Sequence, residues 1–201
     1  MNDEFAKEYL HEGLRRIRAA LLWKLDGLSE YDIRRPLTAT GTNLLGLVKH
    51  VARLEARYFG EVFNRPSPEP LPRWQDDTDG SGLWVTPDET REQIIGFYRR
   101  TWEHSDATIN ELPLDAPGHV PWWPDPKVNL FAIMVHVRSD ATRHAGHADI
   151  LREGLDGRTG TFPQYEEQIN EEARAAHCAM IEQAAKAADS PAATPPQVNR
   201  A

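Results

Sequence analysis

The sequence contains very little cysteine: Cys178 is the only one among 201 residues. A single cysteine cannot form an internal disulfide, which agrees with a reducing compartment or with a fold that needs no covalent cross-link. His177 stands next to Cys178, but adjacent positions of a helix point about 100° apart, so the two do not make a nucleophile and base pair. The sequence gives no support to catalysis by cysteine.

Long apolar runs and clustered basic charge are also missing. No uninterrupted apolar segment approaches the roughly 18 to 20 residues that cross a bilayer, and the first residues lack the basic-then-apolar pattern of a secretory signal. The formal net charge is −8, and no block of Lys and Arg stands out. We therefore expect a cytoplasmic protein with neither a membrane nor a nucleic acid as partner.

Strand patterns and internal repeats are absent, whereas apolar residues recur at helical spacing in five segments. In the first segment, charged residues such as Arg18 and Lys24 lie between the apolar positions, as in an amphipathic helix. Thr42 or Asn43 can cap the second helix, and Pro87 is suited to open the third. The pattern predicts helices at about 3–28, 43–63, 87–112, 129–155 and 165–187.

These elements predict an all-α fold: a four-helix bundle with long connecting loops, at 64–86 and 113–126, and an additional C-terminal helix. A hydrophobic content of 40% can bury one substantial core. We therefore expect a single helical-bundle domain over residues 1–188. Residues 189–201 are expected to form a disordered tail rich in Pro and Ala.

Several polar side chains share the apolar face of the fourth predicted helix. At about 100° per residue, His136, His144 and His147 all lie within about 40° of Asp140 around the helix axis. The same face carries Ile133 and Leu151. Imidazole and carboxylate groups in a bundle core are costly to desolvate unless something pairs with them.

His50 lies in the same way on the second predicted helix, three residues after Leu47 and four before Leu54. One imidazole from that helix and a carboxylate and imidazole at i and i+4 from the fourth can bind a divalent metal. Three protein ligands leave coordination positions open, as in catalytic sites. The alternatives are core histidines that only form hydrogen bonds and an ordinary i,i+4 helix contact. The spacing alone leaves all of these open.

Three motifs carry a resemblance to a known family: residues 40–50, 116–123 and 142–152. Together they resemble the DUF664 branch of the DinB/YfiT-like superfamily, whose relatives include mycothiol-dependent maleylpyruvate isomerase and bacillithiol transferases. The resemblance covers residues from about 19 to 157. It implies a four-helix bundle that binds a divalent metal through a His of the second helix and a His or Glu, plus a His four residues later, on the last helix of the bundle.

Carried over to this chain, the resemblance implies His50, Asp140 and His144 as metal ligands. The departure is Asp140, because relatives usually have Glu or His there and Asp is shorter by one methylene. His147 is the natural additional ligand or orienting group, and His136 is expected in the core or beside the ligands. Zn²⁺ is the first choice of metal, with Ni²⁺ or Fe²⁺ as alternatives.

The loop at 113–126 contains His119, Trp122 and Trp123, which we expect to line the cofactor or substrate pocket. The alternative is that this Trp- and Pro-rich loop only plugs one end of the bundle.

The resemblance implies a metal-dependent thiol transferase or isomerase that uses a metal-held thiolate. Because Cys178 is remote from the motifs in sequence, the thiol would come from mycothiol or another low-molecular-weight thiol. The substrate would be a small molecule, and the protein is expected to form a homodimer. The alternatives are a metal-dependent hydrolase, a non-catalytic metal- or ligand-binding bundle of the stress-response type, and a metal-free structural bundle.

Overall fold

The computed structural model describes residues 3–72, 80, 82–163 and 170–189. The chain forms two compact units, Met1–Glu166 and Glu167–Ala201.

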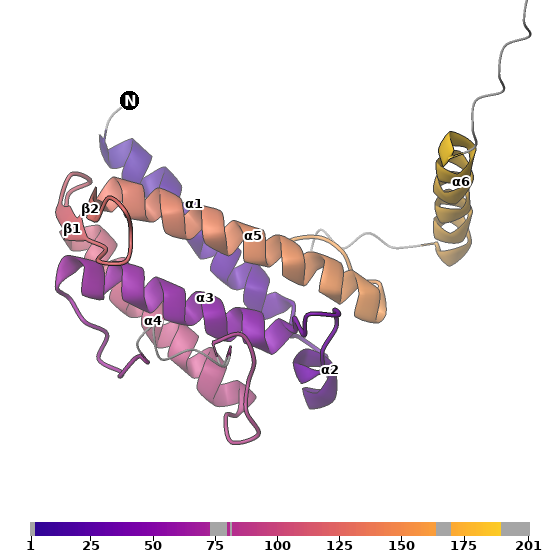
Figure 1. The fold of residues 1–201 in the computed structure, drawn as a ribbon, viewed down its shortest axis with the longest axis horizontal. Helices are drawn as coiled ribbons and strands as arrows, with labels where there is room; N and C mark the ends of the chain where they lie inside the picture. The colour runs from indigo at the N-terminus through magenta and orange to yellow at the C-terminus, as the bar shows by residue number, and fades with distance from the viewer. Residues whose placement is uncertain (1–2, 73–79, 81, 164–169, 190–201) are drawn as a thin grey trace, which may run out of the picture. The chain divides into compact units, whose positions relative to one another are not determined.

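Four long helices build the first unit: α1 (Asp3–Trp23), α3 (Leu44–Phe59), α4 (Arg91–Glu111) and α5 (Leu130–Asp156). They run side by side as a bundle, in which α3 packs against both α4 and α5 and α1 packs against α5 (Figure 1). A short helix, α2 (Glu30–Arg34), precedes α3, and a 3₁₀ turn, η1 (Glu61–Phe63), follows it. The predicted all-α bundle is confirmed.

The most buried helix is α3, on which every residue except His50 and Arg53 is buried or nearly so. Its apolar side chains, among them Leu47, Val51 and Leu54, belong to one continuous hydrophobic core with residues of the other long helices. A polar side chain on this helix therefore faces either a neighbouring helix or the rim of the core.

The capping residues show where α3 and α4 begin, and these starts can be compared with the predicted ones. The Asn43 side chain accepts a hydrogen bond from the Gly46 N–H at 2.8 Å, so one of the two predicted caps of α3 is confirmed. The prediction that α4 opens at Pro87 is wrong. Thr90 caps that helix in a capping box with Gln93, and Pro87 lies in the turn before it.

The first helix ends at Trp23, earlier than predicted. The Arg152 guanidinium of α5 donates to the carbonyls of Lys24 and Asp26, both at 2.9 Å, just after that end. Gly27 follows with φ of +76°, which suits a glycine. A side chain from a distant helix thus satisfies the backbone where α1 stops.

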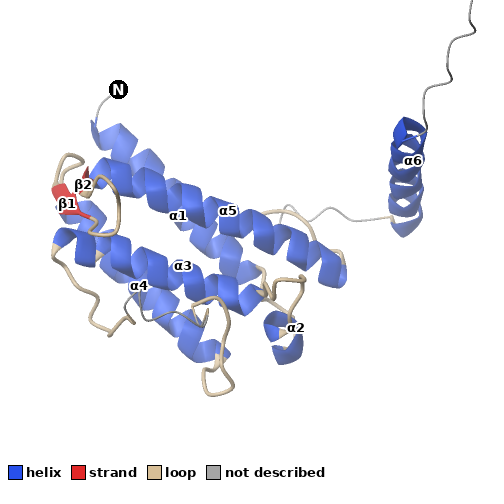
Figure 2. Ribbon diagram, in the orientation of Figure 1, coloured by secondary structure: helices blue, strands red, loops and turns tan. Residues whose placement is uncertain are grey.

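A small antiparallel hairpin interrupts the helices, in contrast to the absence of strands in the sequence pattern. Strands β1 (Pro117–His119) and β2 (Lys127–Asn129) pair with Gly118 opposite Val128 (Figure 2). Three-residue strands are too short to show alternation. A Cβ at Gly118 would stand 2.8 Å from Val62 Cγ1, so glycine lets the hairpin approach η1 closely.

In the second unit, α6 (Glu171–Asp189) is the helix predicted near the C-terminus. The boundaries of the predicted domain, 1–188 and 189–201, stay a prediction, because the tail from residue 190 on lies outside the described residues. Within the described part of the chain, no helix combines the length and hydropathy that a bilayer crossing requires.

Candidate metal centre

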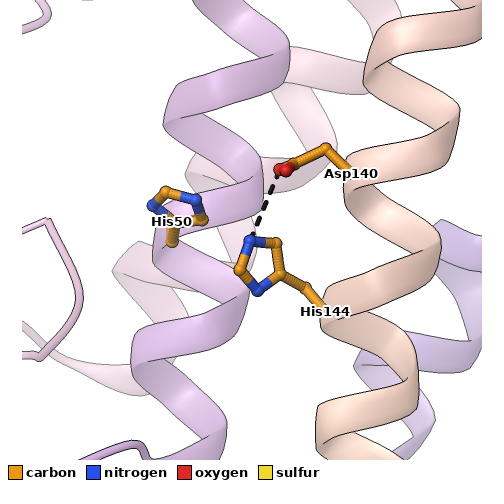
Figure 3. A group of neighbouring side chains, drawn as sticks. All are labelled: His50, Asp140 and His144. Carbon is orange, nitrogen blue, oxygen red and sulfur yellow. Dashed lines mark ion pairs between the residues drawn. The ribbon is translucent and has the colours of Figure 1, made fainter.

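The side chains of His50, Asp140 and His144 converge between α3 and α5. Each offers a ligand atom, and these atoms lie within 4.8 Å of one another. Figure 3 shows Asp140 and His144 extending from successive turns of α5 toward α3, where His50 stands. The i,i+4 spacing puts both α5 groups on one face, and the packing of α3 against α5 supplies the third.

The cluster lies at the rim of the core and not at its centre. On α5, the apolar side chains of Val137, Ala141 and Ala148 are buried in the core. The side chains of His144 and Asp140 are 15% and 28% exposed. A small molecule can therefore reach groups that are otherwise largely removed from water.

The electrostatic environment favours a neutral imidazole at His144. Burial lowers the pKa of His144, the charge of Asp140 opposes this, and His147 and Arg143 lower it further, so that the net direction is downward. His144 Nε2 lies 3.4 Å from Asp140 Oδ2, and the rings of His50 and His144 meet edge to face at 4.6 Å between centroids. The neutral form is the one that binds metal ions.

Two buried atoms of this cluster make no hydrogen bond: Asp140 Oδ2, which has only the 3.4 Å ion-pair contact with His144 Nε2, and His144 Nδ1. Buried polar atoms in folded proteins are nearly always satisfied, so unsatisfied ones call for an explanation. Two imidazoles and one carboxylate are a donor set that suits Zn²⁺ and also Ni²⁺ or Fe²⁺. The residues present therefore fit a divalent cation, and the shorter side chain of Asp140 still reaches the cluster.

The other two predicted histidines flank the cluster. His147 is exposed, and its ring centroid lies 5.5 Å from that of His144. The His136 ring packs against Tyr58 and Trp123 at 4.6 and 4.8 Å between centroids. Burial lowers the pKa of His136, and the charge of Asp140 opposes this. His147 as an additional ligand or orienting group stays a prediction.

A cavity of about 450 Å³ opens beside His144 and His147. Apolar side chains of Leu47, Leu83 and Trp84 form part of its lining, and residues 40–42 and Gly80 also line it. The sequence reasoning missed Leu83 and Trp84, because they belong to a long loop without periodicity. The sequence signal for the position of the cavity was the motif at 40–50, because it contains His50 and also residues 40–42 and Leu47 of the lining.

The loop residues predicted to bind a cofactor lie elsewhere. The indole N–H groups of Trp122 and Trp123 donate to the Tyr58 hydroxyl at 3.4 and 3.2 Å, and His119 is exposed in β1. None of the three is among the described residues that line the cavity beside His144. Their role in binding a cofactor stays a prediction.

Comparison with known proteins gives a family match and a likeness in fold. A family model described as mycothiol-S-transferase matches residues 9–157. This range includes α3, α4 and α5 completely and most of α1. The search of curated proteins returned no match. The crystal structure of a conserved protein from Enterococcus faecalis is similar with a TM-score of 0.56 at 15% identity, over 75% of this chain and 97% of that one. At that identity the likeness concerns the fold alone.

Proposed function

The chain belongs to the mycothiol-S-transferase family of the DinB/YfiT-like superfamily, and from this premise we propose that it joins mycothiol, or a similar low-molecular-weight thiol, to a small electrophile at a metal centre. The observation that carries the proposal is the convergence of His50, Asp140 and His144, of which Asp140 and His144 each have a buried side-chain atom without a hydrogen bond. These three residues would hold a divalent cation, with Zn²⁺ as the first choice.

When bound, a divalent cation lowers the pKa of a thiol or water that it coordinates by several units and so supplies a nucleophile at neutral pH. The chain's own contribution is to hold the cation and to orient the groups around it. His50 approaches from one helix and Asp140 and His144 from another, so the geometry is fixed by the packing of α3 on α5. Leu47 and Leu83 give the adjoining cavity apolar walls.

The overall reaction balances without any further reactant. The thiol sulfur forms a new bond to the acceptor carbon, the leaving group departs with its bonding electron pair, and the thiol proton is released to solvent. The nearby cavity gives the acceptor a place next to the two imidazoles of His144 and His147.

The test uses mycothiol with monochlorobimane, which becomes fluorescent when sulfur replaces its chloride. Zinc-loaded protein should form the adduct faster than the uncatalysed reaction, and chelation or His144→Ala should reduce the rate to background. His104→Gln is the matched control, because the Nε2 of this partly buried imidazole instead contacts the Arg65 carbonyl at 2.7 Å. Equal rates with and without metal, or in His144→Ala, would contradict the proposal.

The type of reaction, whether transfer, isomerisation or hydrolysis, stays a prediction. A thiol-dependent isomerase would convert its substrate with no net consumption of thiol, and a hydrolase would work without thiol, so the same assay with thiol omitted separates these chemistries. The DUF664 branch, the homodimer and the cytoplasmic location are likewise predictions that await direct measurement.

A further inference from the structure

Leu83 and Trp84 are two consecutive large apolar side chains that remain 51% and 43% exposed. Single exposed apolar side chains are common and need no explanation. These two, however, line the cavity that also contains His144 and His147. They therefore present apolar surface directly beside the candidate metal centre.

The backbone behind these side chains is held from several directions. Lys49 Nζ donates to the Trp84 carbonyl at 3.0 Å and to Glu89 Oε2 at 2.8 Å. The same Glu89 oxygen accepts from the Thr86 N–H at 2.9 Å, and the Leu83 N–H donates to the Gly80 carbonyl at 2.9 Å. The exposure of Leu83 and Trp84 is thus not that of a loosely attached loop.

Gly46 of α3 adds a second constraint. A Cβ at this position would collide with the carbonyl oxygen of Leu83, so the loop lies directly on the helix backbone. The first turn of α3 and the loop are therefore packed together, with Leu47 of the next position contributing to the same cavity wall.

The lining of the cavity also restricts the charge of its occupant. Among the described residues that line it, none is Asp, Glu, Lys or Arg; the polar groups are the hydroxyls of Thr40 and Thr42 and the two imidazoles. A carboxylate on an acceptor would lose hydration at this wall without gaining a cationic side chain as partner, so that only an ion bound at the metal centre would attract it. The volume of about 450 Å³ is within the range of small-molecule pockets.

We propose that Leu83 and Trp84 form the wall that binds the apolar part of the acceptor, and that this wall selects uncharged, aromatic or aliphatic electrophiles over anionic ones of the same size. The inference rests on the proposed function, because it assigns the acceptor of that same reaction. It makes Trp84 a specificity-determining residue that contacts the substrate.

The experiment measures binding and omits the thiol. Full-length protein, zinc-loaded and in parallel stripped of metal by a chelator, is dialysed to equilibrium against 3,5-dinitrobenzotrifluoride or against 3,5-dinitrobenzoate, a neutral and an anionic probe that share one ring and carry no leaving group. The stripped protein reports on the wall alone, because a bound cation would itself attract the carboxylate. In the stripped protein the neutral probe should bind about tenfold more tightly than the anionic probe. Trp84→Ala should weaken the neutral probe by about tenfold, and Trp84→Phe should restore most of that loss.

Two further variants control the result. Phe5→Ala removes another exposed aromatic ring, on α1, and should leave the dissociation constants of both probes unchanged. Leu83→Asp places a carboxylate in the wall and should weaken the neutral probe even if Trp84→Ala folds poorly. Circular dichroism and metal content establish that each variant keeps its fold and its ion.

Equal affinity of the stripped protein for the two probes, or an unchanged affinity for the neutral probe in both Trp84→Ala and Leu83→Asp, would overturn the inference. Because no thiol is present, these outcomes are independent of transfer. If the protein prefers the neutral probe but forms no adduct with mycothiol, the proposed function is contradicted. The inference about Leu83 and Trp84 would still hold.

Discussion

At the residue scale, the charged groups buried beside the core are as informative as the candidate ligands. Arg18 of α1 contacts both Glu55 of α3 and Asp106 of α4, and His11 Nε2 lies 2.7 Å from the same Asp106 carboxylate. Arg18 and Glu55 are almost completely buried. This network ties three helices together by charge-assisted hydrogen bonds.

Asp106→Asn tests this network through its pH dependence. Burial alone would raise the pKa of the Asp106 carboxyl, but His11 and Arg18 bring it below its ordinary value of 3.8. The folded state therefore binds this proton more weakly than the unfolded state, and the stabilisation is present above pH 3.8 and is lost as the pH falls through the lowered pKa.

Urea unfolding should show the substitution lowering the free energy of unfolding by about 2 kcal/mol at neutral pH. The difference between wild type and variant should shrink below pH 3.8. A difference that stays constant down to pH 2 would show that Asp106 does not carry the effect.

Asp140 is the residue at which the chain departs from the pattern implied by the family resemblance. Because its carboxylate is one of three converging groups, Asp140→Ala should weaken metal binding roughly 100-fold. Asp140→Glu keeps a carboxylate and should retain most of the affinity. Competition with a chromophoric chelator measures both; an unchanged affinity in Asp140→Ala would remove this residue from the ligand set and leave His147 as the natural replacement.

At the element scale, the first turns of α3 combine several tasks within one short motif. Asn43 caps the helix, Gly46 admits the Leu83 carbonyl, Lys49 holds the backbone of Trp84, and His50 joins the metal cluster. One helix start therefore positions both the cavity wall and a candidate ligand.

Replacing Gly46 should expose this coupling. Alanine favours a helix over glycine by roughly 1 kcal/mol, but at Gly46 its Cβ would push against the Leu83 carbonyl. We expect Gly46→Ala to displace residues 83–84 and to weaken binding of the neutral probe severalfold.

Gly154→Ala on α5 is the matched control, because nothing lies within 4 Å of a Cβ there. It should raise the thermal midpoint slightly and leave probe binding alone. Equal behaviour of the two variants in thermal denaturation and probe dialysis would contradict the close packing of Leu83 on Gly46.

Helical periodicity was sufficient to predict the long helices, because each buries a continuous apolar stripe. Periodicity did not predict features that depend on single side-chain contacts or on capping residues. Arg18 and Lys24 were placed between the apolar positions of an amphipathic helix, yet both are buried because Glu55, Asp106 and Asp149 pair with them. The start of α4 was missed because the Thr90 capping box outweighs the preference of proline for a first turn.

At the scale of the whole molecule, the sequence predicted the metal cluster better than the cavity beside it. His50, Asp140 and His144 follow from spacing on two helices and from the family motifs. Leu83 and Trp84 come close to them only because the loop folds back onto Gly46, and no local pattern in the sequence records that approach.

A truncated chain ending at Glu166 tests whether the first unit is sufficient. The family match ends at residue 157, and nearly all described side chains of α6 are exposed. The truncated protein should therefore keep its metal content, and its thermal midpoint should stay within a few degrees of wild type. A large loss of stability would instead favour the single domain over residues 1–188.

The account depends most directly on metal stoichiometry, measured by mass spectrometry on protein purified without a chelating tag. We predict about one divalent ion per chain in wild type and in His104→Gln, and almost none in His50→Ala or His144→Ala while circular dichroism shows an intact bundle. Full metal content in both of the latter variants would contradict the claim that α3 and α5 together hold the ion.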